Sequence, residues 1–213
     1  MHHFTHSHAQ PETAGTLIRW ATLYDLMAGR LVRASDRPIV GLAGIRPGDV
    51  VLDVACGPGS LTKAAEDAAG PSGAAYGIDA APEMIARARR NALRTGSRAD
   101  FRVAAAERLP FADATFDTVL SRLAFHHLPG DLKRQALAEI RRVLKPGGQC
   151  FVVDFEPSGT PLRHLLGLAG MAAMAQVNVQ AYARLFEEQG FEQVEVGRTS
   201  VAWLAFVRGR KPA

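Results

Sequence analysis

Between residues 49 and 154, short apolar runs alternate with amphipathic stretches whose apolar positions recur every three or four residues. A short apolar run bounded by Gly, Pro or Asp is typical of a buried strand, and the 3.6-residue period is typical of a helix. Their alternation predicts a doubly wound α/β fold, with a mostly parallel sheet and helices on both faces. The predicted strands are 49–54, 74–79, 100–104, 116–121 and 148–154, and the predicted helices are 59–69, 82–95 and 131–144.

The segments on either side of this alternation add a helical cap and a closing hairpin. Apolar residues between 14 and 33 recur at helical spacing. We therefore divide the chain into a flexible tail with an N-terminal helical cap, 1–45, and a main domain, 46–213. The remaining predicted elements, which complete a seven-stranded sheet, are a helix over 178–189 and two antiparallel strands over 191–196 and 201–208.

The stretch at about 160–176 is very apolar and carries few charges. Its pattern predicts a helical insertion, which is too short to span a bilayer. Three roles stay open for this insertion: a lid over an apolar substrate, a dimer interface, or a peripheral contact with a membrane surface.

The chain has 213 residues, a net charge of +4 and a pI near 9.4. Its basic residues form no long run, which argues against nucleic acid as a partner. Two cysteines exclude a disulfide-dense secreted fold. Since we find no signal peptide and no transmembrane segment, we expect a cytoplasmic location. No metal site is predicted, because the histidines near the N-terminus are interpreted as part of a polar tail.

The most informative stretch is the turn after the first predicted strand, Asp53-Val54-Ala55-Cys56-Gly57-Pro58-Gly59. Glycines in such a turn let the backbone approach a ligand closely. Asp79 ends the next predicted strand, where nucleotide-binding α/β folds place a carboxylate for ribose hydroxyls. These features predict a nucleoside site at the carboxyl ends of two adjacent parallel strands. A dinucleotide fingerprint needs a small residue where this chain has Thr62, which weakens an interpretation as an NAD-dependent oxidoreductase.

This turn resembles the first motif, D-x-G/A-x-G-x-G, of the class I S-adenosylmethionine-dependent methyltransferases. The chain is similar to their type 11 domain over residues 47–156, and most similar to the subgroup that includes the ubiquinone and menaquinone C-methyltransferases. The resemblance implies a Rossmann-like methyltransferase fold, S-adenosylmethionine as cofactor and S-adenosylhomocysteine as product. Further stretches that look like family motifs, in the family's order, are 77–85, 107–111, 116–119 and 143–148.

The resemblance also implies roles in the cofactor site. Asp53 would hold the ammonium of the cofactor's amino-acid tail, and Asp79 would accept both ribose hydroxyls. Ala80 and Met84 would flank the adenine. The family commonly has an acidic residue for the adenine amino group where this chain has Ala105, so neighbouring groups would have to replace it. The expected cofactor-binding residues are Asp53, Ala55, Gly57, Gly59, Asp79, Ala80, Met84, Ala106, Glu107 and Ser121.

Methyl transfer from a sulfonium depends mainly on alignment, and a base is needed only where the acceptor must lose a proton. His126 and His127 follow the fourth predicted strand, in a loop that faces the substrate pocket in similar enzymes, and histidine suits general-base work. A purely structural role for the pair stays open, as do Asp154 and Glu156 as alternative bases. The expected residues of the substrate pocket are Trp20, Tyr24, Arg122 and Asp154.

Together these features predict an enzyme that transfers a methyl group from S-adenosylmethionine to a small, apolar or aromatic acceptor. N-methylation of a small amine or a phospholipid head group is the alternative reaction. A methyltransferase-like binding protein without catalysis is the alternative class. The acceptor's identity and the choice between monomer and homodimer are left open, because this scaffold carries many acceptors.

Overall fold

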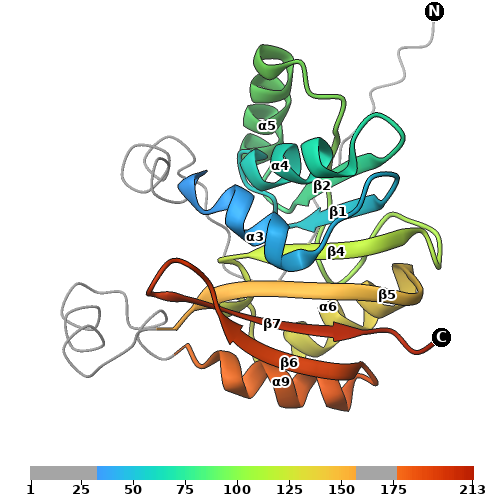
Figure 1. The fold of residues 1–213 in the computed structure, drawn as a ribbon, viewed down its shortest axis with the longest axis vertical. Coiled ribbons are helices and arrows are strands. Elements are labelled where there is room, and N and C mark those ends of the chain that lie inside the picture. The colour runs from blue at the N-terminus through green and yellow to red at the C-terminus, as the bar shows by residue number, and fades with distance from the viewer. Residues whose placement is uncertain (1–32, 157–176) are drawn as a thin grey trace, which may run out of the picture.

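The computed structural model describes residues 33–156 and 177–213, whose strands form a seven-stranded sheet in the order β3-β2-β1-β4-β5-β7-β6 (Figure 1). The first five strands are parallel to one another, and β7 runs antiparallel to both β5 and β6. The predicted doubly wound, mostly parallel sheet is confirmed. The strands are β1 (Val50–Val54), β2 (Ala74–Asp79), β3 (Asp100–Val103), β4 (Phe116–Arg122), β5 (Leu144–Phe155), β6 (Glu192–Arg198) and β7 (Leu204–Arg210).

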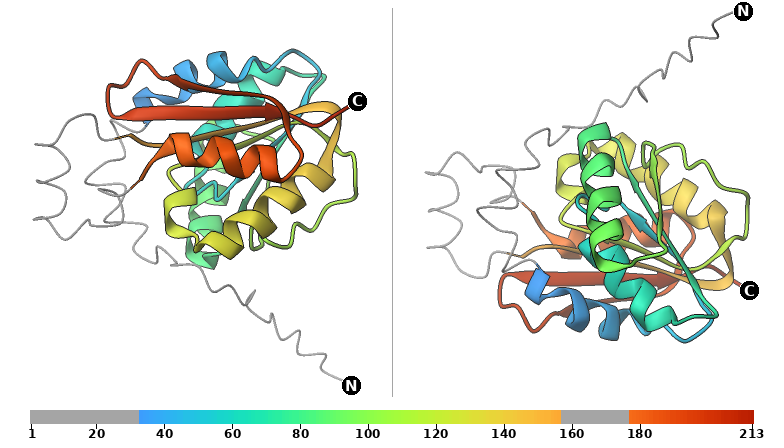
Figure 2. Two further views of the ribbon diagram at one scale, coloured as in Figure 1. Left: turned by 90° about the horizontal axis from the view of Figure 1, so that it is seen from below. Right: turned by 90° about the horizontal axis from the view of Figure 1, so that it is seen from above.

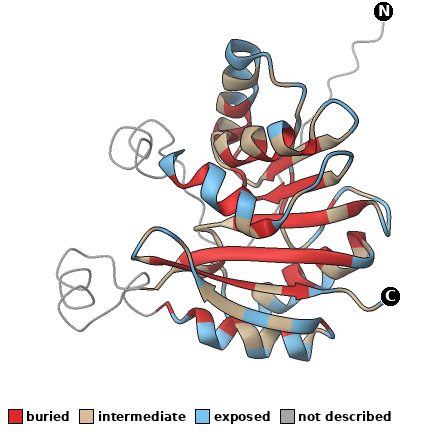
Figure 3. Ribbon diagram, in the orientation of Figure 1, coloured by how far each residue is buried: buried red, intermediate tan, exposed pale blue. Residues whose placement is uncertain are grey.

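Helices lie on both faces of this sheet. Figure 2 shows α3 and α4 on one side of β5 and β7 and α6 and α9 on the other, and Figure 3 shows that the central strands between these layers are buried. The described helices are α3 (Asp36–Ala43), α4 (Ser60–Ala69), α5 (Pro82–Thr95), the 3-10 helix η1 (Phe125–His127), α6 (Gly130–Val143) and α9 (Val179–Glu188).

Alternate residues of the central strands contribute to two different cores. Val51 lies in one buried cluster with Leu61 of α4, whereas its neighbour Leu52 lies in another cluster with Ile140 of α6 and Phe186 of α9. Successive side chains of a strand point to opposite faces, so an uninterrupted apolar run is what a sheet covered on both sides requires. The layers leave the carboxyl ends of β1 and β4 side by side, at the point where the strand order reverses. In open α/β sheets this is where ligands bind.

Tertiary contacts explain where β5 differs from its predicted range. The helix predicted to end at 144 ends at Val143, and β5 begins at Leu144 instead of 148 because Leu144 pairs with Phe116 of β4. The Gly147 N–H donates to the Lys211 carbonyl (3.0 Å), and the Lys211 N–H donates to the Gly148 carbonyl (2.9 Å). These two bonds join the Gly147-Gly148 segment of β5 to the residues that follow β7.

The closing hairpin is antiparallel, as predicted, but its second strand begins later. The sequence predicts that strand from 201, whereas β7 begins at Leu204. The Thr199 N–H donates to the Leu204 carbonyl (3.1 Å), and the Leu204 N–H donates to the Val201 carbonyl (2.9 Å). Both bonds close a turn over residues 200–203, which removes those residues from the strand.

Helix α3 was not predicted as a separate element, because Pro38 and Gly41 interrupt its short apolar pattern. It lies within the range assigned to the N-terminal cap. The predicted helix over 14–33, apart from Arg33, and the predicted apolar insertion lie outside the described residues. Within the described ranges, no helix is long and apolar enough to cross a membrane.

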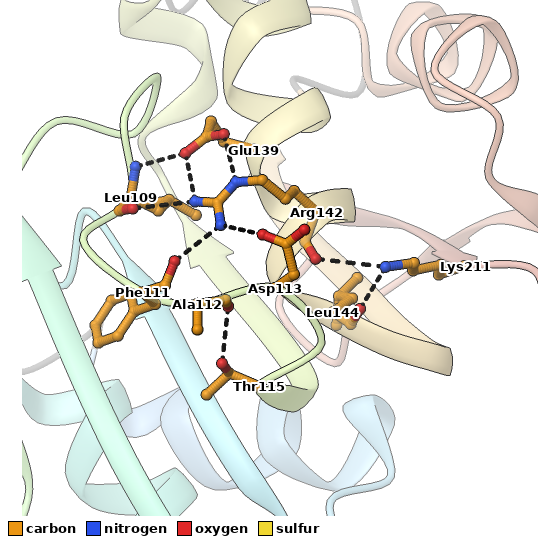
Figure 4. Close-up of polar contacts among 9 residues, drawn as sticks. All are labelled: Leu109, Phe111, Ala112, Asp113, Thr115, Glu139, Arg142, Leu144 and Lys211. Atoms are coloured by element: carbon orange, nitrogen blue, oxygen red, sulfur yellow. Dashed lines mark hydrogen bonds and ion pairs between the residues drawn. The ribbon is translucent and has the colours of Figure 1, made fainter.

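The segment before β4 is irregular, yet one arginine of α6 holds it in place (Figure 4). Arg142 donates to the carbonyls of Leu109 (3.1 Å) and Phe111 (2.8 Å) and forms ion pairs with Glu139 (2.8 Å) and Asp113 (2.7 Å). Glu139 also accepts from the Leu109 N–H (2.8 Å). The guanidinium lowers the pKa of Glu139. The motif at 107–111 therefore marks a loop whose backbone carbonyls are fixed by α6.

Candidate cofactor and substrate site

The turn between β1 and α4 has a backbone that favours glycine. Gly57 has φ 52° and Gly59 has φ 83°, and Ala55, where the motif allows Gly or Ala, has φ 59°. A Cβ added at Gly59 would lie 2.8 Å from two atoms of the Phe101 ring, whereas one added at Gly57 would meet nothing within 4 Å. Gly59 is therefore required by both backbone conformation and space, and Gly57 by conformation alone.

Asp79, at the end of β2, connects this turn to the next one. One of its carboxylate oxygens accepts from the Gly57 N–H (2.9 Å), and the other accepts from the Ala81 N–H (2.9 Å). Burial raises the pKa of Asp79, and these two backbone hydrogen bonds oppose that shift. A carboxylate has about four acceptor positions, so each oxygen can still accept a bond from a ligand hydroxyl.

Asp53 lies at the carboxyl end of β1 and is 1% exposed. The Thr62 hydroxyl, on α4, donates to its Oδ2 (2.7 Å). Burial raises the pKa of Asp53 to about 7, and the Thr62 bond and the positive charge of Arg122 act against this shift. Since a buried carboxylate is stabilised by an opposite charge, a cation beside Asp53 would favour its ionised form.

Side chains of α5 and β3 support the turn between β1 and α4. An open pocket of about 830 Å³ lies among α3, α4 and α5, and Pro58 and Gly59 form part of its wall. Asn91 of α5 also lines this pocket, and its side-chain amide donates to the Pro58 carbonyl (3.0 Å). Phe101 packs in one cluster with Cys56 and Ile85. The turn is thus supported by a side-chain hydrogen bond and by an aromatic ring.

The segment after β3 lies beside Asp79, because the Ala104 N–H donates to the Asp79 carbonyl (3.1 Å). This bond brings the next residues, Ala105, Ala106 and Glu107, to the same edge of the sheet as the predicted adenine-flanking residues. Ala105 is 5% exposed and Met84 is 4% exposed, while Ala80, Ala106 and Glu107 are half-buried.

Ser121 and Arg122 end β4 but have different contacts. The Ser121 hydroxyl donates to the Val54 carbonyl (2.9 Å), which ties the ends of β4 and β1 together. The Arg122 guanidinium forms an ion pair with Asp36 of α3 and donates to the Ser60 hydroxyl (3.3 Å) at the start of α4. Arg122, predicted as a pocket residue, thus joins two helices to the sheet and also acts electrostatically on Asp53.

His126 and Asp154 meet beyond the ends of β4 and β5. His126 Nδ1 lies 2.7 Å from one oxygen of Asp154, and the His126 backbone N–H donates to the other (2.9 Å). Asp154 is fully buried and also accepts from the Tyr182 hydroxyl (3.1 Å) and the Phe155 N–H (2.9 Å). With four donors around it, this carboxylate is better suited to orienting His126 than to accepting a proton from a substrate.

The second histidine differs from the first. The rings of His127 and His126 have centroids 3.9 Å apart. Burial, with a contribution from His126, lowers the pKa of His127 to about 4, so His127 is neutral and a weak base at pH 7. Glu156, the other alternative base, accepts from the Val179 N–H (3.0 Å) at the start of α9.

The structure thus brings together most of the predicted residues at one edge of the sheet, while Trp20 and Tyr24 lie outside the described residues. Sequence reasoning did not include three supporting residues of this site. Thr62 was considered only as a mismatch to the dinucleotide fingerprint, and Asn91 and Tyr182 lie in helices outside every motif. Groups of three or more potential metal ligands are absent from the two described ranges.

Comparison with known sequences relates this chain to methyltransferases. Residues 51–148 match a family model described as a methyltransferase domain. The chain is 40% identical over 139 residues to the "Ubiquinone/menaquinone biosynthesis C-methyltransferase UbiE" of Burkholderia mallei (strain SAVP1). That alignment covers 65% of this chain and 56% of the relative, so the chain spans little more than half the length of the curated relatives it matches.

Solved structures show the same fold. A SAM-dependent methyltransferase from Aquifex aeolicus is similar with a TM-score of 0.74 and 21% identity, over 90% of this chain and 96% of that one. Phosphoethanolamine N-methyltransferase 2 of Haemonchus contortus, in complex with S-adenosyl-L-methionine, is similar with a TM-score of 0.67 and 15% identity, over 92% of this chain and 61% of that one. At these identities the likeness confirms the Rossmann-like fold alone.

Proposed function

We propose that this chain transfers a methyl group from S-adenosylmethionine to a small acceptor, because residues 51–148 match a family model described as a methyltransferase domain. The observation that carries this proposal is the pair of carboxylates, Asp53 and Asp79, on either side of a turn with positive φ angles. When bound, S-adenosylmethionine supplies a methyl group that its sulfonium already activates.

The residues of this site match the groups that S-adenosylmethionine presents. Asp53 is a buried carboxylate whose described hydrogen-bond donor is Thr62, which leaves acceptor positions for the ammonium of the amino-acid tail. Asp79 keeps an acceptor position on each oxygen for the two ribose hydroxyls. Gly57 has open space where a side chain would be, so its backbone can lie close to the cofactor.

The other predicted cofactor-binding residues keep their roles in this proposal. Ala55 and Gly59 shape the turn, and the Ser121 hydroxyl fixes the end of β4 against β1. Around the adenine we place Ala80, Met84, Ala106 and Glu107. Since Ala105 has no acidic group, Glu107 or backbone groups of this segment would recognise the adenine amino group.

We further propose that the acceptor is aromatic and is methylated on carbon. This finer proposal is supported by the 40% identity to a protein named as a quinone-biosynthesis C-methyltransferase. The apolar stretch at 160–176 is consistent with an apolar acceptor. The alternative, N-methylation of an amine that needs no base, makes no use of the histidine and carboxylate beyond β4 and β5.

A calorimetric titration tests the cofactor part of the proposal. We expect S-adenosylhomocysteine to bind and NAD to give no heat of binding. Asp79→Ala should weaken S-adenosylhomocysteine binding by about 10- to 100-fold, because two hydrogen bonds to a charged acceptor are lost. The matched control is Asp67→Ala, which removes an exposed carboxylate of α4. Binding of NAD instead, or an unchanged affinity in Asp79→Ala, would refute this placement of the nucleoside.

An acceptor screen with a labelled methyl donor tests the reaction. Hydroquinones and phenols with apolar substituents should accept the label, and product analysis should find the methyl group on a ring carbon. Transfer to small amines alone would replace the C-methylation proposal by the N-methylation alternative. S-adenosylhomocysteine binding without transfer to any acceptor class would instead favour a binding protein without catalysis.

A further inference from the structure

His126 is held by contacts on both its backbone and its ring. Two of these go to Asp154, whose oxygens contact the backbone N–H (2.9 Å) and Nδ1 (2.7 Å) of His126. The Phe155 ring lies nearly perpendicular to the His126 ring, with ring centroids 5.9 Å apart. The His126 side chain is 3% exposed, so its ring has little freedom to turn.

Asp154 is held as firmly as the histidine. The oxygen that contacts the His126 backbone N–H, Oδ2, also accepts from the Tyr182 hydroxyl (3.1 Å). The oxygen beside Nδ1, Oδ1, also accepts from the Phe155 N–H (2.9 Å). Tyr182 comes from α9, while Asp154 ends β5 and His126 belongs to η1. Three separate elements therefore converge on one carboxylate, and the Tyr182 bond prevents it from turning away from the imidazole.

This arrangement defines which nitrogen of His126 carries the proton. A carboxylate can only accept, so the nitrogen beside it, Nδ1, carries hydrogen, and the lone pair of a neutral ring lies on Nε2. Among the described residues, Nε2 has no hydrogen-bond partner. In the same residues, Arg141 Nε is the one polar side-chain atom that is buried without a partner. Nε2 is therefore the ring nitrogen of His126 that no described residue occupies.

Position in the sheet places His126 and Asp154 at the edge where ligands bind in open α/β sheets. His126 follows β4, and Asp154 lies one residue beyond the partner of Arg122 in β5, at the carboxyl ends of both strands. Asp53 lies at the carboxyl end of the neighbouring β1, which pairs with β4. The base and the proposed cofactor site are therefore on the same edge of one parallel sheet.

We propose that Asp154 and Tyr182 are positioning residues that hold His126 with its proton on Nδ1, so that Nε2 takes a proton from an acceptor bearing a hydroxyl group. This proposal rests on the methyl transfer proposed above and narrows its acceptor to hydroxylated compounds. The titratable groups near the three residues are His127, Lys133 and Glu156. The His127 ring is tilted by 43° against the His126 ring, with centroids 3.9 Å apart. The Lys133 ammonium lies 5.8 Å from the centre of the Tyr182 ring, and Glu156 acts electrostatically on Tyr182.

The proposed methyl transfer begins at the hydroxyl group of the acceptor. The O–H bond of the acceptor breaks and its proton bonds to Nε2, which leaves an imidazolium beside the Asp154 carboxylate. The electron pair left on the acceptor, on oxygen or on a conjugated ring carbon, bonds to the methyl carbon as the methyl–sulfur bond breaks and its pair remains on sulfur. In methylation on carbon, the C–H bond at the methylated ring carbon then breaks, its electron pair restores the aromatic ring, and the oxygen regains a proton. One proton per turnover finally passes to water.

Nitrogen NMR of the full chain labelled at histidine tests the tautomer without any acceptor. The His126 signals, identified by their loss in His126→Gln, should show hydrogen on Nδ1 at pH 8. In Asp154→Asn, the tautomer with hydrogen on Nδ1 should no longer be the major form. In Tyr182→Phe, its population should be smaller than in the wild-type protein. The control is Tyr76→Phe, which removes a tyrosine hydroxyl from another aromatic cluster and should change nothing. A dominant Nε2–H form in the wild-type protein would overturn the proposal.

Kinetics with a phenolic acceptor provide the second test. We expect Asp154→Asn to lower kcat by about 10²- to 10⁴-fold and Tyr182→Phe by about 2- to 10-fold, with KM changed less than about twofold. An acidic phenol that is already ionised at pH 8 should restore most of the lost rate, which a merely structural defect would not allow.

The affinity for S-adenosylhomocysteine separates the two proposals. It should be unchanged in both variants, since neither residue belongs to the proposed cofactor site. If the wild-type protein fails to bind S-adenosylhomocysteine, the proposed function is wrong. The NMR measurement of the His126 tautomer then still tests whether Asp154 and Tyr182 position His126. If the wild-type protein binds S-adenosylhomocysteine and both variants keep wild-type kcat, the positioning proposal is wrong.

Discussion

Asp53 is the residue through which we expect pH to affect cofactor binding at the proposed site. Burial raises its pKa to about 7, so below pH 7 it must lose a proton before it can pair with an ammonium group. We expect the affinity for S-adenosylhomocysteine to fall about tenfold between pH 8 and pH 6 and to level off above pH 8. Calorimetry across this range in Asp53→Asn should find weaker binding without that dependence, whereas Asp67→Asn should behave like the wild-type protein. A flat profile in the wild-type protein would contradict this role.

Gly59 is the second residue whose effect follows directly from local geometry. In Gly59→Ala the new Cβ would lie 2.8 Å from the Phe101 ring, at a φ of 83° that side chains rarely adopt. We expect a loss of about 1–3 kcal/mol in unfolding free energy and at least a tenfold weaker affinity for S-adenosylhomocysteine, measured by urea unfolding and calorimetry.

The matched control for this substitution is Gly41→Ala in helix α3. A Cβ there meets nothing within 4 Å, and alanine is favoured over glycine in a helix by about 0.5–1 kcal/mol. Gly41→Ala should therefore leave stability unchanged or raise it slightly. Equal effects of the two substitutions would mean that the turn around Gly59 is not tightly packed.

At the scale of elements, helix α3 is attached to the sheet by a buried ion pair. Asp36 and Arg122 each have side chains 9% exposed, and Arg122 also contacts Ser60 of α4. Removing one partner leaves a buried charge uncompensated, which costs about 3–5 kcal/mol. We expect Asp36→Ala to reduce the unfolding free energy by about this amount. Amide hydrogen exchange should become faster in α3 than in the other helices of the domain.

An exposed pair provides the comparison. Asp131 and Arg134 are 93% and 50% exposed, and solvent screens such pairs, so Asp131→Ala should change stability by less than about 1 kcal/mol. If Asp36→Ala is as mild as Asp131→Ala, the interpretation of Arg122 as an anchor for α3 is wrong, and its predicted role in the substrate pocket becomes the better one.

For the whole molecule, the proposed cofactor site joins β1, β2 and α4, so a bound ligand should stabilise the domain as a unit. A ligand at 100 times its dissociation constant adds about 2.7 kcal/mol. In a domain of this size that corresponds to a rise in Tm of about 5–10 °C. Scanning calorimetry with S-adenosylhomocysteine should show this rise, and NAD should not. Asp79→Ala should lose most of it, and an equal rise in that variant would contradict the site.

Much of the fold follows from local patterns, and the two misplaced strand boundaries have different causes. Strand β1 and helix α5 begin and end within a residue of their predicted ranges, because their apolar periods and flanking Gly or Pro are local signals. The start of β5 and the second strand of the hairpin were misplaced. The start of β5 depends on hydrogen bonds between distant segments, such as Gly147 with Lys211, whereas the start of β7 depends on a local turn closed by Thr199, Val201 and Leu204.

The order of apolar residues and glycines along the chain was sufficient to predict a parallel sheet and a nucleoside site around Asp53 and Asp79. The first strand, the glycine turn and both carboxylates lie within residues 50–79, one continuous stretch whose pattern can be recognised before the chain folds. The pairing of His126 with Asp154 and Tyr182 required the folded molecule. These residues are separated by 28 positions at each step, and they meet only because β4, β5 and α9 pack at one edge of the sheet.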